Sequence, residues 1–277
     1  MQPAPKISLN NGVLIDALGF GVYKVPADEC AGLVRTAFDA GYRTIDTAAL
    51  YANEEGVGQA VRAAVAEGTD REDIFVTSKV WNDRHGYQET LDAFGESMDR
   101  LGLDYLDLFL IHWPCPEQDQ YIPTYKALET LYHEGKVRAI GVSNFEPDHL
   151  ERLLEATEVV PAVNQVELHP WLQQKTLRAL HEQLGIRTQA WSPLARGQLL
   201  DDPELGRIAA AHNRTVAQIV LRWHLEIGNL VIPKASTPAR VRENLDVFDF
   251  TLSNAELAAI ESMDRGHHSG SSPLKVN

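Results

Sequence analysis

Four side chains that can hold or move a proton stand at or just beyond the ends of short apolar segments: Asp46, Tyr51, Lys79 and His112. A free tyrosine, with a pKa of about 10, is a weak acid at neutral pH, but a neighbouring ammonium group lowers that pKa. A buried lysine keeps its charge when a carboxylate pairs with it. If the four residues meet, the set predicts proton donation to a carbonyl oxygen. Tyr51 would be the acid, Lys79 would tune it, Asp46 would keep Lys79 charged, and His112 would orient or polarise the oxygen.

Each residue also has a plain structural explanation when it is taken alone. Asp46 could cap a turn, Tyr51 could belong to the core, Lys79 could lie on the surface, and His112 could be a hydrogen-bonded core histidine. A metal site is a weaker interpretation, because the sequence has no H-x-H or H-E-x-x-H motif and His112 and His169 lack an obvious third ligand. The occurrence of all four at strand ends favours the chemical interpretation.

The segment that leads to His112 shows how such residues are positioned. Residues 106–111, LDLFLI, are almost continuously apolar, which indicates a strand buried on both faces. Pro114 cannot continue a sheet ladder, so the strand must end near it. His112 therefore follows the carboxyl end of a buried parallel strand, the edge at which α/β folds carry their chemistry.

The same alternation of strand and helix recurs along the chain. A hairpin over 6–15, with its turn at Asn11-Gly12, comes first. Eight strands are predicted at 17–20, 44–45, 74–78, 106–111, 137–142, 162–166, 187–190 and 230–232. Helices are predicted at 28–40, 54–66, 88–101, 124–133, 147–155, 175–184, 203–212, 215–226, 238–245 and, after the capping box at Ser253, to about 263.

Eight such units predict an α/β fold of the (β/α)8 TIM-barrel type, with an N-terminal β-hairpin and two extra helices, as a single domain over residues 1–277. The Gly/Ser-rich tail at 266–277 is expected to be mobile. A doubly wound open sheet is the alternative, but one that binds a dinucleotide would usually carry G-x-G-x-x-G. Gly19 and Gly21 lack the third glycine of that motif, and Gly56 and Gly58 fall within a predicted helix.

Composition limits the partners. The net charge of −14 makes nucleic acid an unlikely ligand, and no stretch of about 18 apolar residues suggests a membrane span. Two cysteines make no disulfide framework, and the first residues, MQPAPKISLNNG, lack the apolar core of a signal peptide. We expect a cytoplasmic protein that acts as a monomer on a small molecule.

Six segments resemble the aldo-keto reductases, and together they extend over most of the chain. They are GYRTIDTAALYANEEGVG (41–58), VTSKVWN (76–82), LDLFLIHWP (106–114), VRAIGVSNF (137–145), PAVNQVELHP (161–170) and VIPKASTPARVRENL (231–245). NDRHG (82–86) and ENLDVFDF (243–250) are most similar to the bacterial 2,5-diketo-gluconate reductases. The resemblance implies NADPH-dependent reduction of an aldehyde or ketone, with Asp46, Tyr51, Lys79 and His112 as the catalytic tetrad.

The resemblance also implies a cofactor site, residue by residue. Positions matching the nicotinamide carboxamide contacts are Ser143, Asn144 and Gln165, and the position matching the aromatic that stacks on the nicotinamide is Trp191. Positions beside the pyrophosphate are Ser192 and Leu194. The 2′-phosphate pocket matches Lys234, Ser236, Thr237 and Arg240, and the adenosine contacts match Glu243 and Asn244.

The residues around the predicted 2′-phosphate pocket support an anion site independently. Lys234, Arg240 and Arg242 form a local basic cluster on an acidic protein, just before and within the start of a predicted helix. A solvated basic surface is the alternative. Ala235 stands where many family members carry a serine, which removes one hydroxyl contact. We nevertheless predict a preference for NADPH over NADH.

Substrate contacts are predicted at Tyr23, Trp81 and Trp113, which match aromatic positions of the family's pocket. Packing at the barrel end is the alternative explanation for each. The short tail implies an open pocket for small polar carbonyls: dicarbonyls such as methylglyoxal, short aldehydes or keto-sugar acids. Two other functions stay open: an NADPH-binding regulatory protein with slow turnover, and a barrel enzyme of different chemistry that ignores NADPH.

Overall fold

Eight parallel strands form the centre of the computed structural model, which describes residues 4–277 except for the side chain of Leu274. In chain order, and each paired with the next, they are β3 (Phe20–Gly21), β4 (Thr44–Asp46), β5 (Phe75–Val80), β6 (Leu106–Ile111), β7 (Val137–Ser143), β8 (Val163–Glu167), β9 (Arg187–Trp191) and β10 (Leu230–Val231). The two edges join: the Gly19 amide donates to the Val231 carbonyl (2.9 Å), and the Val231 amide donates to the Ala17 carbonyl (2.9 Å). The sheet is thus a closed barrel, as predicted.

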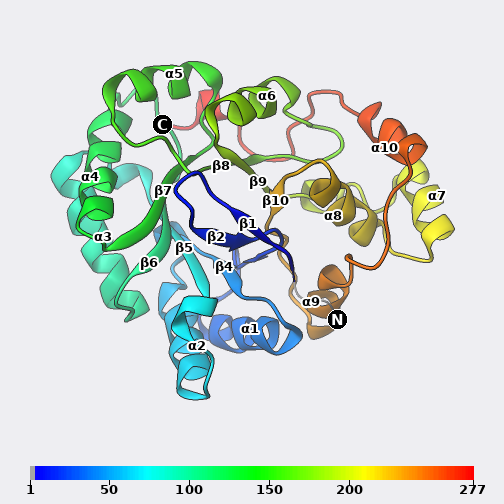
Figure 1. Ribbon diagram of the computed structural model, residues 1–277, viewed down its shortest axis with the longest axis horizontal. Coiled ribbons are helices and arrows are strands. Elements are labelled where there is room, and N and C mark those ends of the chain that lie inside the picture. Colours follow the sequence, from blue (N-terminus) through cyan, green and yellow to red (C-terminus); the bar gives the residue numbers. More distant parts are fainter. Residues whose placement is uncertain (1–3) are drawn as a thin grey trace.

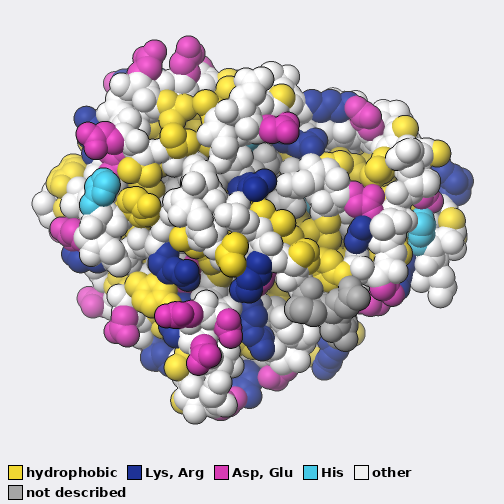
Figure 2. All heavy atoms as spheres, in the orientation of Figure 1, with side chains coloured by type: hydrophobic (Ala, Val, Ile, Leu, Met, Phe, Trp, Pro, Cys, Tyr) yellow, Lys and Arg dark blue, Asp and Glu magenta, His cyan; other side chains and the backbone are white. Residues whose placement is uncertain are grey.

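Helices surround the strands as an outer ring (Figure 1). They are α1 (Ala27–Ala40), α2 (Glu54–Ala66), α3 (Tyr87–Leu101), α4 (Tyr121–His133), α5 (Pro147–Ala156), α6 (Lys175–Leu184), α7 (Pro203–His212), α8 (Val216–Glu226), α9 (Pro238–Leu245) and α10 (Asn254–Glu261). Most of them follow a barrel strand in sequence, while α7 and α10 are the two additional helices. Acidic and basic side chains are interspersed on the face shown in Figure 2.

The N-terminal hairpin closes one end of the barrel. Its strands, β1 (Lys6–Ser8) and β2 (Leu14–Asp16), lie across the barrel in the centre of Figure 1. Leu9 and Ile15 pack in one buried cluster with residues near the starts of the strands, among them Phe75 and Val163. Because this end is filled with apolar side chains, the polar chemistry is confined to the opposite end, where the strands terminate.

Local sequence explains most element ends. Gly102 ends α3 in the left-handed conformation (φ 59°), which a residue without Cβ adopts at little cost. The predicted capping box at Ser253 is present, with the Ser253 hydroxyl accepting from the Glu256 amide. Gly58 serves a different purpose, because a Cβ there would overlap the Leu101 carbonyl where α2 meets α3.

Three predicted boundaries differ from the structure in an informative way. The fourth helix begins at Tyr121 instead of 124, because Pro123 lies in the first turn, where an amide has no helical partner to lose. Strand β5 extends to Val80, so Lys79 belongs to the strand and points inward instead of following it. The first barrel strand is only Phe20–Gly21, with an isolated bridge at Leu18.

Two absences hold for the part of the chain that the structure describes. No helix there has the length and apolar character needed to cross a membrane. No group of three or more His, Cys, Asp or Glu side chains is arranged to hold a metal ion in that same part. Cys30 and Cys115 are both free and buried.

Candidate active site

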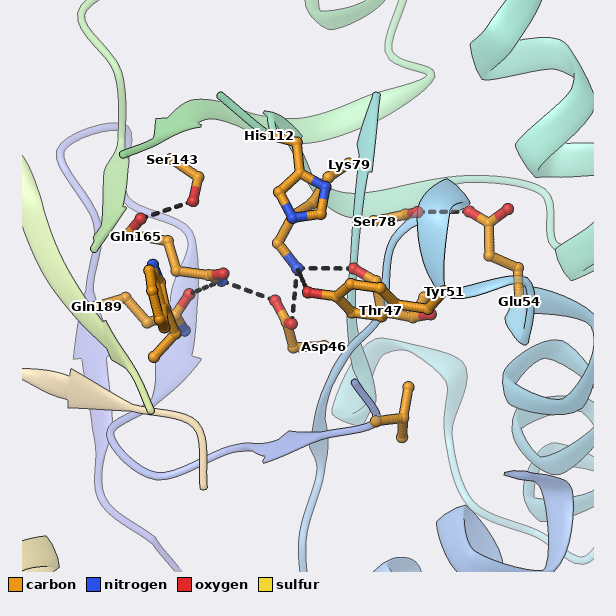
Figure 3. Close-up of polar contacts among 12 residues, drawn as sticks. Asp46, Thr47, Tyr51, Glu54, Ser78, Lys79, His112, Ser143, Gln165 and Gln189 are labelled. Atoms are coloured by element: carbon orange, nitrogen blue, oxygen red, sulfur yellow. Dashed lines mark hydrogen bonds and ion pairs between the residues drawn. The ribbon is translucent and has the colours of Figure 1, made fainter. Parts of the chain in front are cut away.

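The four residues singled out from the sequence meet at the carboxyl end of the barrel (Figure 3). Lys79 on β5 is fully buried, and its Nζ lies 2.7 Å from Asp46 Oδ1, 2.8 Å from the Thr47 carbonyl oxygen and 3.5 Å from the Tyr51 hydroxyl. The rings of Tyr51 and His112 are 5.7 Å apart between centroids and nearly perpendicular. An acid, a cation, a phenol and an imidazole therefore share one site, as the chemical interpretation requires.

Short local structures aim these side chains. Asp46 is the last residue of β4, and the chain then forms a single 3-10 turn, Ala49–Tyr51, which ends at Ala52 in the left-handed conformation (φ 53°). The turn brings the Tyr51 ring over the Lys79 ammonium, 5.0 Å from Nζ to the ring centroid. His112 follows β6 directly, and its amide continues the ladder by donating to the Val80 carbonyl.

Burial controls the protonation states. Burial raises the pKa of Tyr51 well above its usual value, and the charge of Asp46 adds to the rise. Burial lowers the pKa of Lys79, while the ion pair with Asp46 opposes that change. Burial, together with Lys79 and His85, holds the pKa of His112 well below 6.5, so the imidazole is neutral at pH 7.

The expectation that Lys79 would lower the pKa of Tyr51 is therefore wrong, because burial raises that pKa. The ammonium group near Tyr51 can be expected from the sequence, but the loss of water around the phenol depends on the assembled cleft. A raised pKa keeps the proton on Tyr51, which a proton donor requires.

A hydrogen-bond network joins these residues to the predicted carboxamide contacts. Gln165 Nε2 donates to Asp46 Oδ2 and to Gln189 Oε1, both at 2.8 Å. Asn144, in the left-handed conformation (φ 64°), donates from Nδ2 to the His112 carbonyl at 2.9 Å. The Asn144 side-chain oxygen in turn accepts from Trp191 Nε1 at 2.8 Å. Trp191 is thereby fixed in orientation relative to His112.

Half of the predicted cofactor contacts line the same cleft as Asp46, Tyr51 and His112. Members of this set are Ser143, Asn144, Gln165, Trp191, Ser192 and Lys234. Both hydrogens of Gln165 Nε2 are used, and its Oε1 has no hydrogen-bond partner among residues 4–277. Gln165 Oε1 can accept from an amide, and the half-buried face of Trp191 can stack on a flat aromatic ring. The residues therefore fit a nicotinamide, which carries both groups.

The predicted phosphate pocket is free to take an anion. Lys234, Ser236 and Arg240 are exposed, and neither cation has a carboxylate within 4.0 Å in the described part of the chain. Thr237 caps α9, its hydroxyl accepting from the Arg240 amide at 3.4 Å. Unpaired cations at a helix N-terminus on a protein of net charge −14 fit a phosphate monoester.

The remaining predicted cofactor residues are hydrogen-bonded, buried or packed against the core. Glu243 Oε1 accepts from the Thr215 hydroxyl at 2.8 Å, at the N-terminus of α8, and Asn244 is buried. Leu194 packs against the core and does not line the cleft. Adenosine contacts at Glu243 and Asn244, and a pyrophosphate contact at Leu194, stay predictions.

The three predicted substrate residues form the aromatic walls of the cleft. The Trp81 ring lies 4.9 Å from the His112 ring, and the Tyr23 ring lies 5.0 Å from the Tyr51 ring. Trp113 lies between His112 and Trp191, with its ring centroid 6.4 Å from that of Trp191. Apolar walls around the Tyr51 hydroxyl leave room for a small carbonyl and strengthen the local electrostatic interactions.

Sequence reasoning missed several residues that line the cleft. Arg196 belongs to the loop after β9, and its place five residues after Trp191 is a signal that could have found it. Ser271 and Val276 come from the C-terminal tail, and no periodic pattern in that segment indicates where it lies. Mobility of the tail stays a prediction.

Comparisons with known proteins agree with this geometry. The model of the "Aldo/keto reductase family" matches residues 17–265. Glyoxal reductase of Bacillus subtilis is 50% identical over 268 residues, covering 96% of this chain and 95% of that protein. Methylglyoxal reductase DkgA of Yersinia pestis is 47% identical over 276 residues, covering 99% and 98%. The solved structure of a Gox0644 mutant in complex with NADPH is 48% identical, covers 100% of both chains and superposes with a TM-score of 0.94. The chain therefore belongs to the aldo/keto reductase family.

Proposed function

We propose that this protein uses NADPH to reduce small polar aldehydes and ketones to alcohols, with 1,2-dicarbonyls as its preferred class. The observation that carries the proposal is the buried Lys79–Asp46 ion pair beneath the Tyr51 hydroxyl, at 3.5 Å from it, in a cleft shared with His112 and Trp191. NADPH, when bound, supplies the hydride that the carbonyl carbon accepts.

The chain's own residues supply the proton and the electrostatic field. The Tyr51 hydroxyl donates its proton to the carbonyl oxygen, and the Lys79 ammonium stabilises the phenolate that remains. Neutral His112 donates an N–H to the same oxygen without adding a second positive charge beside Lys79. The ion pair with Asp46 offsets the desolvation cost of burying the Lys79 ammonium, and Gln165 donates a hydrogen bond that orients Asp46.

Support for the cofactor comes from the surfaces on either side of the tetrad. Ser143, Asn144 and Gln165 would bind the carboxamide, and Trp191 would stack on the ring. Further along, the proposed contacts are Ser192 and Leu194 for the pyrophosphate, Lys234, Ser236, Thr237 and Arg240 for the 2′-phosphate, and Glu243 and Asn244 for adenosine. The unpaired cations favour NADPH over NADH, although Ala235 contributes no hydroxyl.

Support for the substrate class comes from the aromatic walls and from two relatives. Tyr23, Trp81 and Trp113 line the cleft next to Tyr51, and such apolar walls suit a short carbonyl compound. Relatives of similar identity are named glyoxal reductase and methylglyoxal reductase, but another, 46% identical, is named morphine 6-dehydrogenase. Closeness to the 2,5-diketo-gluconate reductases, the monomeric state and the cytoplasmic location stay predictions.

The test measures NADPH oxidation with methylglyoxal and phenylglyoxal, beside NADPH binding followed by quenching of tryptophan fluorescence. Tyr51→Phe should lower kcat by about 10²–10⁴-fold while NADPH still binds, because only the proton donor is lost. Tyr87→Phe, on the exposed side of α3, is the matched control and should behave as wild type. Binding without turnover in the wild type would favour the regulatory alternative, and equal efficiency with NADH would contradict the cofactor preference.

A further inference from the structure

Glu167, the last residue of β8, is a buried carboxylate whose hydrogen bonds come largely from the C-terminal tail. Its Oε1 accepts from the Ser269 amide (2.8 Å), the Gly270 amide (3.0 Å) and the Ser269 hydroxyl. His268 Nδ1 lies 3.3 Å from Oε2. Only 3 % of Glu167 is exposed, so these contacts replace nearly all of its water. The proposed chemistry of the cleft assigns this carboxylate no role.

The position of Glu167 places the tail against the candidate active site. Glu167 pairs in register with Trp191 on the neighbouring strand. Gly270, bound to Glu167, passes so close to Trp191 that a Cβ added there would lie 2.6 Å from the indole Cη2 and 3.1 Å from an Arg196 nitrogen. The tail therefore runs directly beside the proposed nicotinamide platform.

The tail then continues along the cleft to a second attachment. Ser271 and Val276 line the cleft together with Tyr51 and His112. Asn277, the last residue, accepts a hydrogen bond through Oδ1 from the Glu117 amide at 3.0 Å, in the loop that follows β6. The tail is thus attached at Glu167 on one side and at this loop on the other, and in Figure 1 it runs from α10 to the C mark near α5.

The charge of Glu167 suits this attachment. Burial alone raises the pKa of Glu167, but hydrogen bonds from His169 and Ser269 outweigh burial and bring the pKa to about 2. The carboxylate is therefore ionised at any physiological pH, and it can accept from two adjacent backbone amides as well as a hydroxyl. A neutral amide at this position would accept more weakly.

We propose that Glu167 is a positioning residue that fixes the C-terminal tail, residues 266–277, as one wall of the carbonyl pocket. The proposal rests on the proposed function of the cleft and deepens it. A wall that is held in place contributes equally to binding of the substrate and of the transition state. Its release therefore raises KM for the carbonyl and leaves kcat nearly unchanged.

Two substitutions release the tail from opposite sides. Glu167→Gln keeps the volume and removes the charge. Gly270→Ala leaves Glu167 intact, and its methyl group pushes the tail away from Trp191. Glu151→Gln removes one carboxylate from an exposed residue on α5 whose side chain makes no hydrogen bond or ion pair in the described part of the chain, and it is the matched control. All variants are studied in the full-length chain.

Two measurements follow the tail and the pocket separately. Hydrogen exchange of the Ser269 and Gly270 amides should become about ten-fold faster or more in Glu167→Gln, since exchange requires that these amides separate from residue 167. KM for methylglyoxal should rise about ten-fold in each single variant, with kcat within about two-fold of wild type. The double variant should show nearly the same KM as either single variant, because both release the same segment.

The outcomes separate this proposal from the function on which it rests. Hydrogen exchange can be measured without turnover. Slow exchange that persists in Glu167→Gln would therefore refute the claim that Glu167 fixes the tail, even if the enzyme reduces no carbonyl tested. Fast exchange with an unchanged KM overturns the role of the tail as a pocket wall. Multiplying KM effects in the double variant would mean that Glu167 acts by another route. If Glu167→Gln does not fold, Gly270→Ala alone gives both measurements.

Discussion

Lys79→Met offers a quantitative test of the buried ion pair. Methionine has nearly the length of lysine, so the substitution removes the ammonium without opening a large cavity. The variant loses the 2.7 Å contact to Asp46 and the 2.8 Å contact to the Thr47 carbonyl. It leaves Asp46, which is only 2 % exposed, as an uncompensated charge whose one remaining donor among residues 4–277 is Gln165.

The expected cost follows from this geometry. Removing one partner of a buried ion pair costs about 3–5 kcal/mol, because the other charge stays buried. The Gln165 hydrogen bond keeps the loss within that range. Unfolding in urea, followed by fluorescence, should show a lower midpoint, and the melting temperature should fall by about 2–4 °C for each kcal/mol.

Two controls define what would refute the reasoning. Lys175→Met removes an exposed pair with Glu261 at 3.1 Å and should cost at most about 1 kcal/mol. Adding Asp46→Asn to Lys79→Met removes the orphaned charge, so the double variant should be more stable than Lys79→Met alone. A cost for Lys79→Met as small as that for Lys175→Met, or a double variant with the sum of both losses, would contradict the account of a buried charge.

Two further predictions concern pH and packing. Burial lowers the pKa of His85 and of His181 from 6.5 to about 4, so between these pH values the unfolded chain binds more protons than the folded protein does. The urea midpoint should therefore fall as the pH drops from 6.5 towards 4. His85→Leu should make the midpoint depend less steeply on pH. A midpoint that does not change with pH would contradict this. Gly58→Ala should lower the free energy of unfolding by about 3 kcal/mol or more, because the added Cβ overlaps the Leu101 carbonyl. Gly95→Ala in α3 should raise it by about 0.5–1 kcal/mol, because the added Cβ meets open space. Urea unfolding of both variants tests this order.

The barrel could be predicted because its signals are local. The run at 106–111 is apolar except for Asp107, and the structure gives the strand those same bounds. The helices at 54–66, 175–184 and 203–212 also have the predicted bounds, since apolar spacing, glycine and proline mark their ends. The meeting of Asp46, Lys79 and His112 then follows from topology, because parallel strands end on one side of a barrel.

Properties that depend on distant parts of the chain could not be predicted in this way. The rise in the pKa of Tyr51 comes from burial, which requires the whole cleft to be assembled. The contacts of Glu167 come from Ser269 and Gly270, in a Gly/Ser-rich segment without periodicity, about a hundred residues along the chain. Burial of a carboxylate by such a segment leaves no pattern in either stretch of sequence.

The joining of the barrel edges has a consequence for how the protein is made. One edge of the first barrel strand pairs with β4, but the partner of the other edge, along residues 17–21, is the segment 231–233. That second edge therefore stays unpaired until the last strand is available. While the chain is still being synthesised, the growing sheet exposes two unpaired edges, and pairing across so long a loop is slow. We therefore expect the nascent chain to aggregate more readily than the finished protein, and to reach its native state only after residues 230–233 have left the ribosome.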